Sequence, residues 1–194
     1  MRKISLDKLR LNLGCGTDIK NDYIDLDIVA LNGIDLVADL AKAPYPFKND
    51  VFDEILMWHV LEHLPDIVIT MEELHRISKP GCNVHIAVPY WNSYGAVVDP
   101  THKSFFHHKT FDYFDLSKKL NQSKDYYTKT KFKITTISYI CELKLLEILQ
   151  ILTLQRHLKI RALILFNLNK SDNDHNHLNF KLSKNNCRCR VNSY

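Results

Sequence analysis

Short apolar segments recur through the first 140 residues, and turn-forming residues separate them. They predict strands over residues 10–13, 23–27, 34–38, 52–58, 83–88 and about 131–138. The runs EILMW and VHIAV are almost continuously apolar, which is typical of parallel strands covered on both faces. Apolar residues recur with helical spacing over residues 68–77, and Pro80 cannot continue a helix there. The pattern therefore predicts a sheet of buried strands with one full helix before the fifth strand.

The links between the first three predicted strands are short. Residues 15–22 give eight positions for the first link, and residues 28–33 give six for the second. A parallel crossover that includes a helix usually needs about 10–12 residues. We therefore expect an α/β fold: a Rossmann-like, mostly parallel sheet with helices on both faces, in which the first helices are shortened.

The last third of the chain has a different, atypical pattern. The segment ELKLLEILQILTLQRHL (142–158) predicts a helix, and ALILFNL (162–168) predicts a following strand. From residue 170 onward few apolar residues remain to offset the entropy of ordering the chain. We therefore expect one domain over residues 1–169 and a polar, disordered tail over residues 170–194.

Composition narrows the class of protein. The chain has 194 residues, a net charge of +4 and five scattered cysteines. That charge is too mild for a dedicated nucleic-acid binder, and no apolar run reaches the length of about 18 residues that a membrane helix needs. The N-terminus has no apolar stretch typical of a signal peptide, so reduced thiols are expected rather than disulfides. These features predict a single cytoplasmic domain with no membrane span.

The segment RLNLGCGTDIKNDYIDLD carries the most informative chemistry. One predicted strand ends at Gly14-Cys15-Gly16, and the next ends at Asp27, eleven positions after Gly16. Glycines at the carboxyl end of a strand let the backbone approach a ligand closely, and an acidic side chain there can accept hydrogen bonds from ribose hydroxyls. A plain glycine-rich turn is the alternative. A dinucleotide fingerprint fits less well, because Ile19 occupies the third glycine position and the acidic residue comes earlier than about 20 residues on.

Five segments follow one another in order along residues 11–114. They are LNLGCGTDIKNDYIDLDI, DLVADL, PYPFKNDVFDEILMWHVLEHL, MEELHRISKPGCNVHIAVPY and DPTHKSFFHHKTFDYF. Taken together, they resemble a class I S-adenosylmethionine-dependent methyltransferase of the small bacterial methyltransferase-type-11-like group. The resemblance implies S-adenosylmethionine as the cofactor and methyl transfer as the activity.

The resemblance also implies roles for particular positions. Residues 13–16 match the motif whose backbone passes beside the methionine part of the cofactor, and Asp27 matches the acidic residue that holds the ribose. Residues 39–40 match the pair near the adenine, although Asp39 alone could simply cap the turn after its strand. Residues 58–59 match the strand end that faces the methyl group. The implied cofactor-binding residues are Leu13, Gly14, Cys15, Gly16, Asp27, Asp39, Leu40, Trp58 and His59.

The run from His59 to His63 also spells H-x-x-E-H, a zinc-peptidase motif in which histidines four residues apart share one face of a helix. Here the run crosses the end of a predicted strand, Pro65 follows within two residues, and the sequence indicates no third ligand downstream. The same letters are common in the methyltransferases that the chain resembles. We therefore expect no metal site.

Residues 99–114 follow the fifth predicted strand and are rich in histidine and aromatic residues. We expect this segment to cover the cofactor site and to contribute to an acceptor pocket; the alternative is a surface segment whose aromatic side chains only pack it down. Methyl transfer to a hydroxyl or an amine is helped by a base. His102 is the first candidate for that proton acceptor, and His59 is the second.

The acceptor is expected to be a small molecule or a glycan intermediate, and nucleic acid is not expected as a partner. Two alternatives stay open. Beyond residue 138 the pattern identifies no final antiparallel hairpin, which would suit a non-catalytic S-adenosylmethionine-binding protein. The lysine-rich stretch 118–133, with tyrosines interleaved, would suit an RNA methyltransferase.

Overall fold

The computed structural model describes residues 7–142 and 161–170. In this part of the chain the strands are β1 (Arg10–Leu13), β2 (Ile24–Asp27), β3 (Leu36–Val37), β4 (Phe52–Trp58), β5 (Ser78–Pro89), β6 (Phe132–Glu142) and β7 (Arg161–Lys170). The helices are η1 (Leu61–His63), α1 (Ile67–Ile77), α2 (Tyr94–Val98), η2 (Thr110–Phe114) and α3 (Lys119–Ser123). None of these helices is long and apolar enough to cross a membrane.

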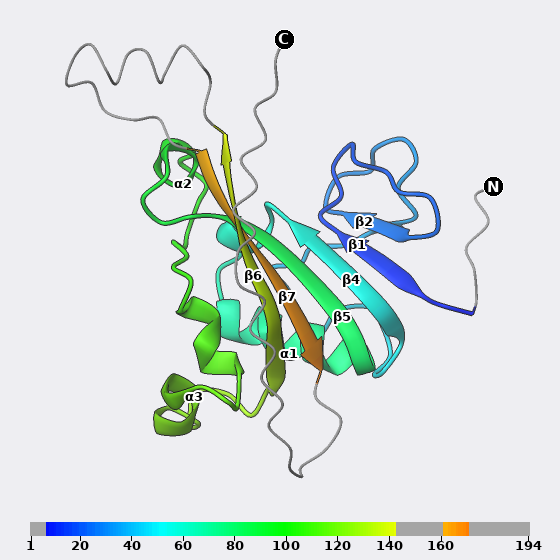
Figure 1. The fold of residues 1–194 in the computed structure, drawn as a ribbon. Helices are drawn as coiled ribbons and strands as arrows, with labels where there is room; N and C mark the ends of the chain where they lie inside the picture. The colour runs from blue at the N-terminus through cyan, green and yellow to red at the C-terminus, as the bar shows by residue number, and fades with distance from the viewer. Residues whose placement is uncertain (1–6, 143–160, 171–194) are drawn as a thin grey trace, which may run out of the picture.

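The strands form one sheet in the order β3-β2-β1-β4-β5-β7-β6 (Figure 1). The first five strands in this order are parallel, whereas β7 runs antiparallel to both of its neighbours. Because β1 lies between β2 and β4, the chain leaves β1 toward one edge of the sheet and later leaves β4 toward the other. The expected α/β class and Rossmann-like, mostly parallel sheet are confirmed.

The C-terminal strands complete this sheet. Strand β6 extends the strand predicted over 131–138, and β7 extends the one predicted over 162–168. They pair antiparallel from Phe132–Lys170 to Glu142–Arg161, so the hairpin that the sequence pattern did not identify is present. Strand β7 also reaches one residue past the expected domain end, and Lys170 Nζ lies 2.7 Å from Asp50 Oδ1. The helix predicted over 142–158 and the predicted tail lie outside the described residues, apart from their first residues.

Strand β5 begins five residues earlier than predicted. Helix α1 ends at Ile77, and the Ser78 hydroxyl donates to the Leu74 carbonyl at 2.6 Å, which closes the last turn. The pairing with β4 is then irregular up to Asn83, and Pro80 falls within this irregular stretch. Proline lacks the N–H of a regular ladder but is tolerated at a bulge. The Lys-Pro-Gly sequence therefore marks a bulge in the strand as well as the end of the helix.

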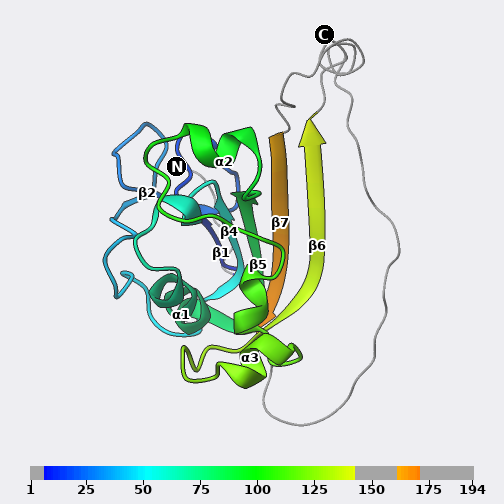
Figure 2. The same cartoon turned by 90° about the vertical axis from the view of Figure 1, so that its left-hand side faces the viewer.

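One face of the sheet forms the hydrophobic core. Its strand residues lie in register across the sheet, and α1 and η2 contribute the facing side chains. The members include Leu11, Leu13, Leu26, Ile55, Met57, Val84, Ile86, Leu168, Met71, Leu74, Ile77, Phe111 and Phe114. Helices α1 and α3 lie on the same side of β5, β7 and β6 (Figure 2). Burial of this apolar surface is the main stabilising contribution that the core residues make.

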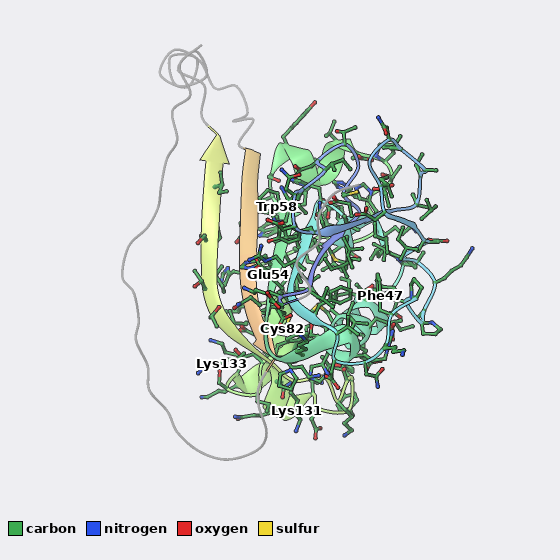
Figure 3. The ribbon with its side chains drawn as sticks, turned by 90° about the vertical axis from the view of Figure 1, so that its right-hand side faces the viewer. Phe47, Glu54, Trp58, Cys82, Lys131 and Lys133 are labelled. Carbon is green, nitrogen blue, oxygen red and sulfur yellow. The ribbon has the colours of Figure 1, made fainter. Side chains whose placement is uncertain are left out.

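The opposite face of β1, β2 and β4 carries polar side chains. Asn12 Nδ2 donates to Asp25 Oδ1 at 2.7 Å and to the Asp18 carbonyl at 2.9 Å, and both Asn12 and Asp25 are buried. Glu54, labelled with Trp58 in Figure 3, accepts a hydrogen bond from the Tyr23 hydroxyl at 2.8 Å. The shortened helices expected in the links over residues 15–22 and 28–33 are replaced by turns and bends, and the first link hydrogen-bonds to this polar face.

A second polar network holds the link between β3 and β4 against α1. Arg76 donates to both carboxyl oxygens of Glu73 and to the carbonyls of Tyr45 and Phe47. The Tyr45 amide in turn donates to Glu73 Oε2 at 2.6 Å. These bonds lower the pKa of Glu73 below its ordinary value, with the Arg76 hydrogen bond as the largest cause.

Candidate functional site

The carboxyl ends of β1, β2 and β4 meet where the chain reverses its direction across the sheet. Open α/β sheets bind ligands at such a switch point. The loop after β1 is fixed to β2 there: the Cys15 amide donates to the Leu26 carbonyl at 3.1 Å, and the Gly16 amide donates to Asp27 Oδ2 at 2.8 Å. The Leu13 and Cys15 side chains are buried, so these two residues can offer a ligand only their backbone.

The two glycines of the loop have different roles. Gly14 (φ 62°) and Gly16 (φ 52°) both adopt the left-handed conformation that favours glycine. A Cβ on Gly14 would overlap Val60 Cγ2 and lie 3.1 Å from Val60 Cγ1. A Cβ on Gly16 would have no neighbour within 4 Å. Gly14 is therefore required by packing inside the protein, whereas Gly16 is the position where a ligand can approach the backbone.

The Asp27 carboxylate is held in place by backbone amides. Besides accepting from Gly16, it accepts from the Val29 amide at Oδ1, over 3.1 Å. Each carboxylate oxygen has two lone pairs, so both oxygens keep acceptor capacity toward the half-buried surface at the end of β2. The geometry suits an acceptor of two hydroxyl hydrogen bonds.

Asp39 follows β3, and its carboxylate stabilises the turn after that strand. Its Oδ1 accepts from the Ala41 amide at 3.0 Å, and its Oδ2 lies 3.3 Å from Lys42 Nζ. The Ala41 bond is the largest cause of a lowered pKa for Asp39, and the charge of Lys103 contributes too. Asp39 therefore caps its turn while its carboxylate stays partly exposed. Leu40, next to it, is packed in the core.

At the end of β4 the side chains alternate as a strand requires. Met57 is fully buried in the core, whereas Trp58 is 47% exposed on the polar face, 5.2 Å from Lys20 Nζ to its ring centroid. His59 has a φ of 57°, which is uncommon for a residue other than glycine. Its amide donates to the Ala87 carbonyl of β5 at 2.9 Å, and this bond fixes the turn.

His59 and Glu62 form a pair at this strand end. The His59 ring is 56% exposed, and its Nδ1 lies 3.2 Å from Oε1 of Glu62, whose side chain is only 1% exposed. A carboxylate can only accept, so Nδ1 carries the hydrogen and Nε2 keeps its lone pair. A buried carboxylate that orients an exposed imidazole in this way is an arrangement suited to accepting a proton.

His102 has a different environment. Its side chain is 7% exposed, its Nδ1 lies 3.0 Å from the Ala96 carbonyl oxygen, and its ring centroid lies 4.7 Å from that of His63. The structure thus brings His102 beside the H-x-x-E-H run but turns it inward. Of the two candidate proton acceptors, His59 is the accessible one.

The segment after β5 lies along the same edge of the sheet. The Lys103 amide donates to the Glu62 carbonyl at 2.7 Å, and the Ser104 amide shares that acceptor at 3.3 Å. The segment also brings the charge of Lys103 close to Asp39. Most of its aromatic side chains, such as Phe106 and Phe111, are buried and anchor it, whereas Phe105 is exposed.

The sequence reasoning missed two features of the site. One is the contact between Gly14 and Val60, which joins the first loop to the turn after β4. The other is the role of Glu62 as partner of His59, for which the three-residue spacing was the available signal. Both depend on the turn at residues 59–63, which periodicity does not describe.

The family model described as "Methyltransferase domain" matches residues 7–139. An S-adenosylmethionine-dependent methyltransferase from Archaeoglobus fulgidus is 17% identical, with a TM-score of 0.58 over 84% of this chain and 86% of that one. The methyltransferase partner of the Haloferax volcanii Trm112 methyltransferase activator is 14% identical, with a TM-score of 0.55 over 90% and 87%. For an S-adenosylmethionine-dependent methyltransferase from Thermotoga maritima the identity is 13% and the TM-score 0.52, over 84% and 82%. No curated protein matches the chain.

Proposed function

Because the chain belongs to the methyltransferase domain family and is an S-adenosylmethionine-dependent methyltransferase, we propose that it methylates a hydroxyl or an amine of a small molecule or a glycan, with His59 as the proton acceptor. The observation that carries this proposal is the pair formed by exposed His59 and buried Glu62 at the end of β4.

The residues at the switch point fit the cofactor. Open space in front of Gly16 leaves room for the methionine part, the carboxylate of Asp27 would accept from the ribose hydroxyls, and that of Asp39 would accept from the adenine amine. Trp58 and the backbone of His59 would flank the sulfonium end. S-adenosylmethionine supplies an electrophilic methyl group, so the protein has to align the acceptor and to take up its proton.

The proton is the part of the reaction that His59 would handle. As the acceptor oxygen or nitrogen gains the methyl group it loses its hydrogen, and His59 Nε2 holds the lone pair that takes it. Glu62 then stabilises the imidazolium, because its Oε1 already accepts from Nδ1. His102, the other candidate, lies beside His63 with its side chain only 7% exposed, and would act by positioning its neighbours rather than by direct contact with the acceptor.

A small acceptor is favoured over RNA by where the basic residues lie. The lysine-rich stretch 118–133 precedes and enters β6, at the amino ends of the parallel strands, whereas the site lies at their carboxyl ends (Figure 1). Lys131 and Lys133 are well separated from Trp58 in Figure 3. The neighbour that binds Trm112 shares the fold at 14% identity, which carries no acceptor over to this chain.

The test combines cofactor binding with methyl transfer. Calorimetry with S-adenosylhomocysteine measures affinity, and radiolabelled S-adenosylmethionine measures transfer to a panel of sugar nucleotides, hydroxylated metabolites and amines. We expect transfer to a member of the panel, and we expect His59→Ala to lower turnover by about 10²–10⁴-fold with cofactor affinity little changed.

The matched control is His108→Ala. In the described part of the chain the ring of His108 contacts that of His107, and not the His59–Glu62 pair. Full turnover by His59→Ala would refute its role as proton acceptor. Cofactor binding without transfer to any acceptor would support the non-catalytic alternative, and transfer to RNA alone would overturn the small-acceptor proposal.

A further inference from the structure

Three side chains with metal-ligating atoms converge beside the proposed acceptor site. Glu62 and His63 come from η1, and His102 comes from the segment after β5. One ligand atom from each lies within 4.8 Å of the other two. Glu62 is 1% exposed, and its Oε2 is buried without a hydrogen-bond partner in the described part of the chain. A buried carboxyl oxygen left unpaired is costly, so its environment calls for a positive partner.

The hydrogen bonds around His63 set its tautomer. Thr101 Oγ1 donates its single hydrogen to Asp99 Oδ1 at 2.6 Å, and it lies 2.9 Å from His63 Nδ1. Because that hydrogen is already used, Thr101 Oγ1 must accept, and His63 Nδ1 must donate. The lone pair of the ring is therefore on Nε2.

The same holds for His102. Its Nδ1 lies 3.0 Å from the Ala96 carbonyl oxygen, which can only accept, so its lone pair is also on Nε2. Histidines that bind a metal commonly donate their other ring N–H to a carbonyl or another oxygen, which fixes the ring and raises its basicity. Both rings of this cluster have such a partner.

We propose that Glu62, His63 and His102 together bind one divalent transition-metal ion. Two imidazoles and one carboxylate suit ions such as Zn²⁺, Co²⁺ or Mn²⁺ better than Ca²⁺ or Mg²⁺, which prefer oxygen ligands only. The ion would pair with Glu62 Oε2, while Glu62 Oε1 stays with His59. Sequence reasoning set zinc aside because no third ligand was indicated; the structure places His102 in that position.

The charges near the cluster are compatible with a cation. Asp99 Oδ2 lies 3.9 Å from His102 Nε2 and adds a second carboxylate at the rim. His59 faces the cluster through Glu62. The competing explanation is that a protonated histidine alone balances Glu62, and the experiment below distinguishes the two.

Three protein ligands leave at least one coordination position open for a water or an acceptor oxygen. An acceptor hydroxyl bound there would lose its proton more readily, and His59 lies one carboxylate away to receive it. This consequence rests on the proposed function and favours acceptors that offer an oxygen. The metal site itself does not depend on it.

Metal binding is tested directly on the full chain, with affinity tags removed. Cys187→Ser and Cys189→Ser are included in every variant so that these thiols do not bind the probe. Chelator-stripped protein is titrated with Co²⁺, followed by visible absorption, and then with Zn²⁺ in competition; elemental analysis gives the stoichiometry. We expect one ion per chain, and an affinity at least about 100-fold weaker in His63→Ala and in His102→Ala.

His108→Ala serves as the matched control, because it removes a histidine from the same segment outside the cluster; its affinity should equal that of the parent. Circular dichroism checks folding, and His63→Gln and His102→Gln replace any variant that fails to fold. Failure of the parent to bind one ion per chain, or equal binding by all the variants, would overturn the proposal. Cofactor calorimetry on the metal-free protein is a separate readout, so loss of cofactor binding alone would overturn the proposed function and leave the metal site standing.

Discussion

The contact between Gly14 and Val60 gives a quantitative test of how the first loop is built. Gly14→Ala adds a Cβ that overlaps Val60 Cγ2, at a residue whose φ is 62°. The left-handed conformation costs a residue other than glycine about 1–2 kcal/mol, and overpacking typically costs about 1–3 kcal/mol. The free energy of unfolding should therefore fall by about 2–5 kcal/mol. For a chain of this size, that lowers the melting temperature by about 4–20 °C.

A double-mutant cycle separates the two contributions. Val60→Ala removes both Cγ atoms of a partly buried side chain and should cost about 1 kcal/mol by itself. In the double variant the overlap is gone, so the total loss should be smaller than the sum of the single losses by about 1–3 kcal/mol. Urea and thermal unfolding followed by circular dichroism give the three values.

Gly16→Ala is the matched control for this cycle. Its Cβ meets nothing within 4 Å, so only the conformational cost remains and Val60→Ala should not relieve it. Strictly additive losses for Gly14→Ala and Val60→Ala would show that the new Cβ does not meet Val60, and would refute the packing role assigned to Gly14.

Two further predictions concern carboxylates. Asp27→Asn should weaken S-adenosylhomocysteine binding by about 10–150-fold in calorimetry, which corresponds to about 1.5–3 kcal/mol for a hydrogen bond to a charged group. The control variant Asp125→Asn should bind as the parent does. Equal affinities of Asp27→Asn and the parent would contradict the assignment of Asp27 to the ribose. Glu73→Gln should lower the free energy of unfolding at neutral pH by about 1–3 kcal/mol, because Arg76 loses its charged partner. The pKa of Glu73 is lowered in the folded protein, so its contribution to stability is complete above the ordinary value of 4.5 and is lost as the pH falls through the folded value. The difference in unfolding free energy between parent and variant should therefore shrink in that range. A difference that does not depend on pH would refute this role of Glu73.

The parts of the fold that the sequence predicted well are those fixed by local pattern. Strands β1 and β4 agree with their predicted ranges, because each holds the apolar residues of a strand and ends at a turn. The start of β5 was missed, since Pro80 and Gly81 are tolerated at an irregular pairing that depends on the neighbouring strand. The hairpin of β6 and β7 was predicted as two separate strands, because their antiparallel pairing is a long-range contact.

The candidate site shows the same division. The places of Asp27 and Gly16 at neighbouring strand ends could be predicted from local pattern, whereas their role toward the cofactor stays a prediction. The burial of His102 beside His63 could not be predicted, because it depends on how the turn after β4 meets a segment about 40 residues later. The pairing of His59 with Glu62 is local, but it depends on the conformation of the turn at residues 59–63, which periodicity does not describe. The sequence predicts which residues lie at a strand end. It does not predict side-chain contacts between segments that are far apart in the chain.

The short links before β2 and β3 have no helix, and polar contacts hold them to the sheet. Asp25 is fully buried, yet its carboxyl oxygens accept from Asn12 Nδ2 at 2.7 Å and from the Lys20 amide at 3.1 Å. Its own amide donates to Asp35 Oδ2 at 2.9 Å. The bonds with Lys20 and Asp35 tie the two links to β2, and the bond with Asn12 joins β1 to β2. A buried polar group that lost its partner would cost about 1–3 kcal/mol. The links therefore do not need an apolar helix face to hold them in place. Because the same links carry Gly16 and flank Asp27, the polar face of the sheet fixes the geometry of the edge that we propose binds the cofactor.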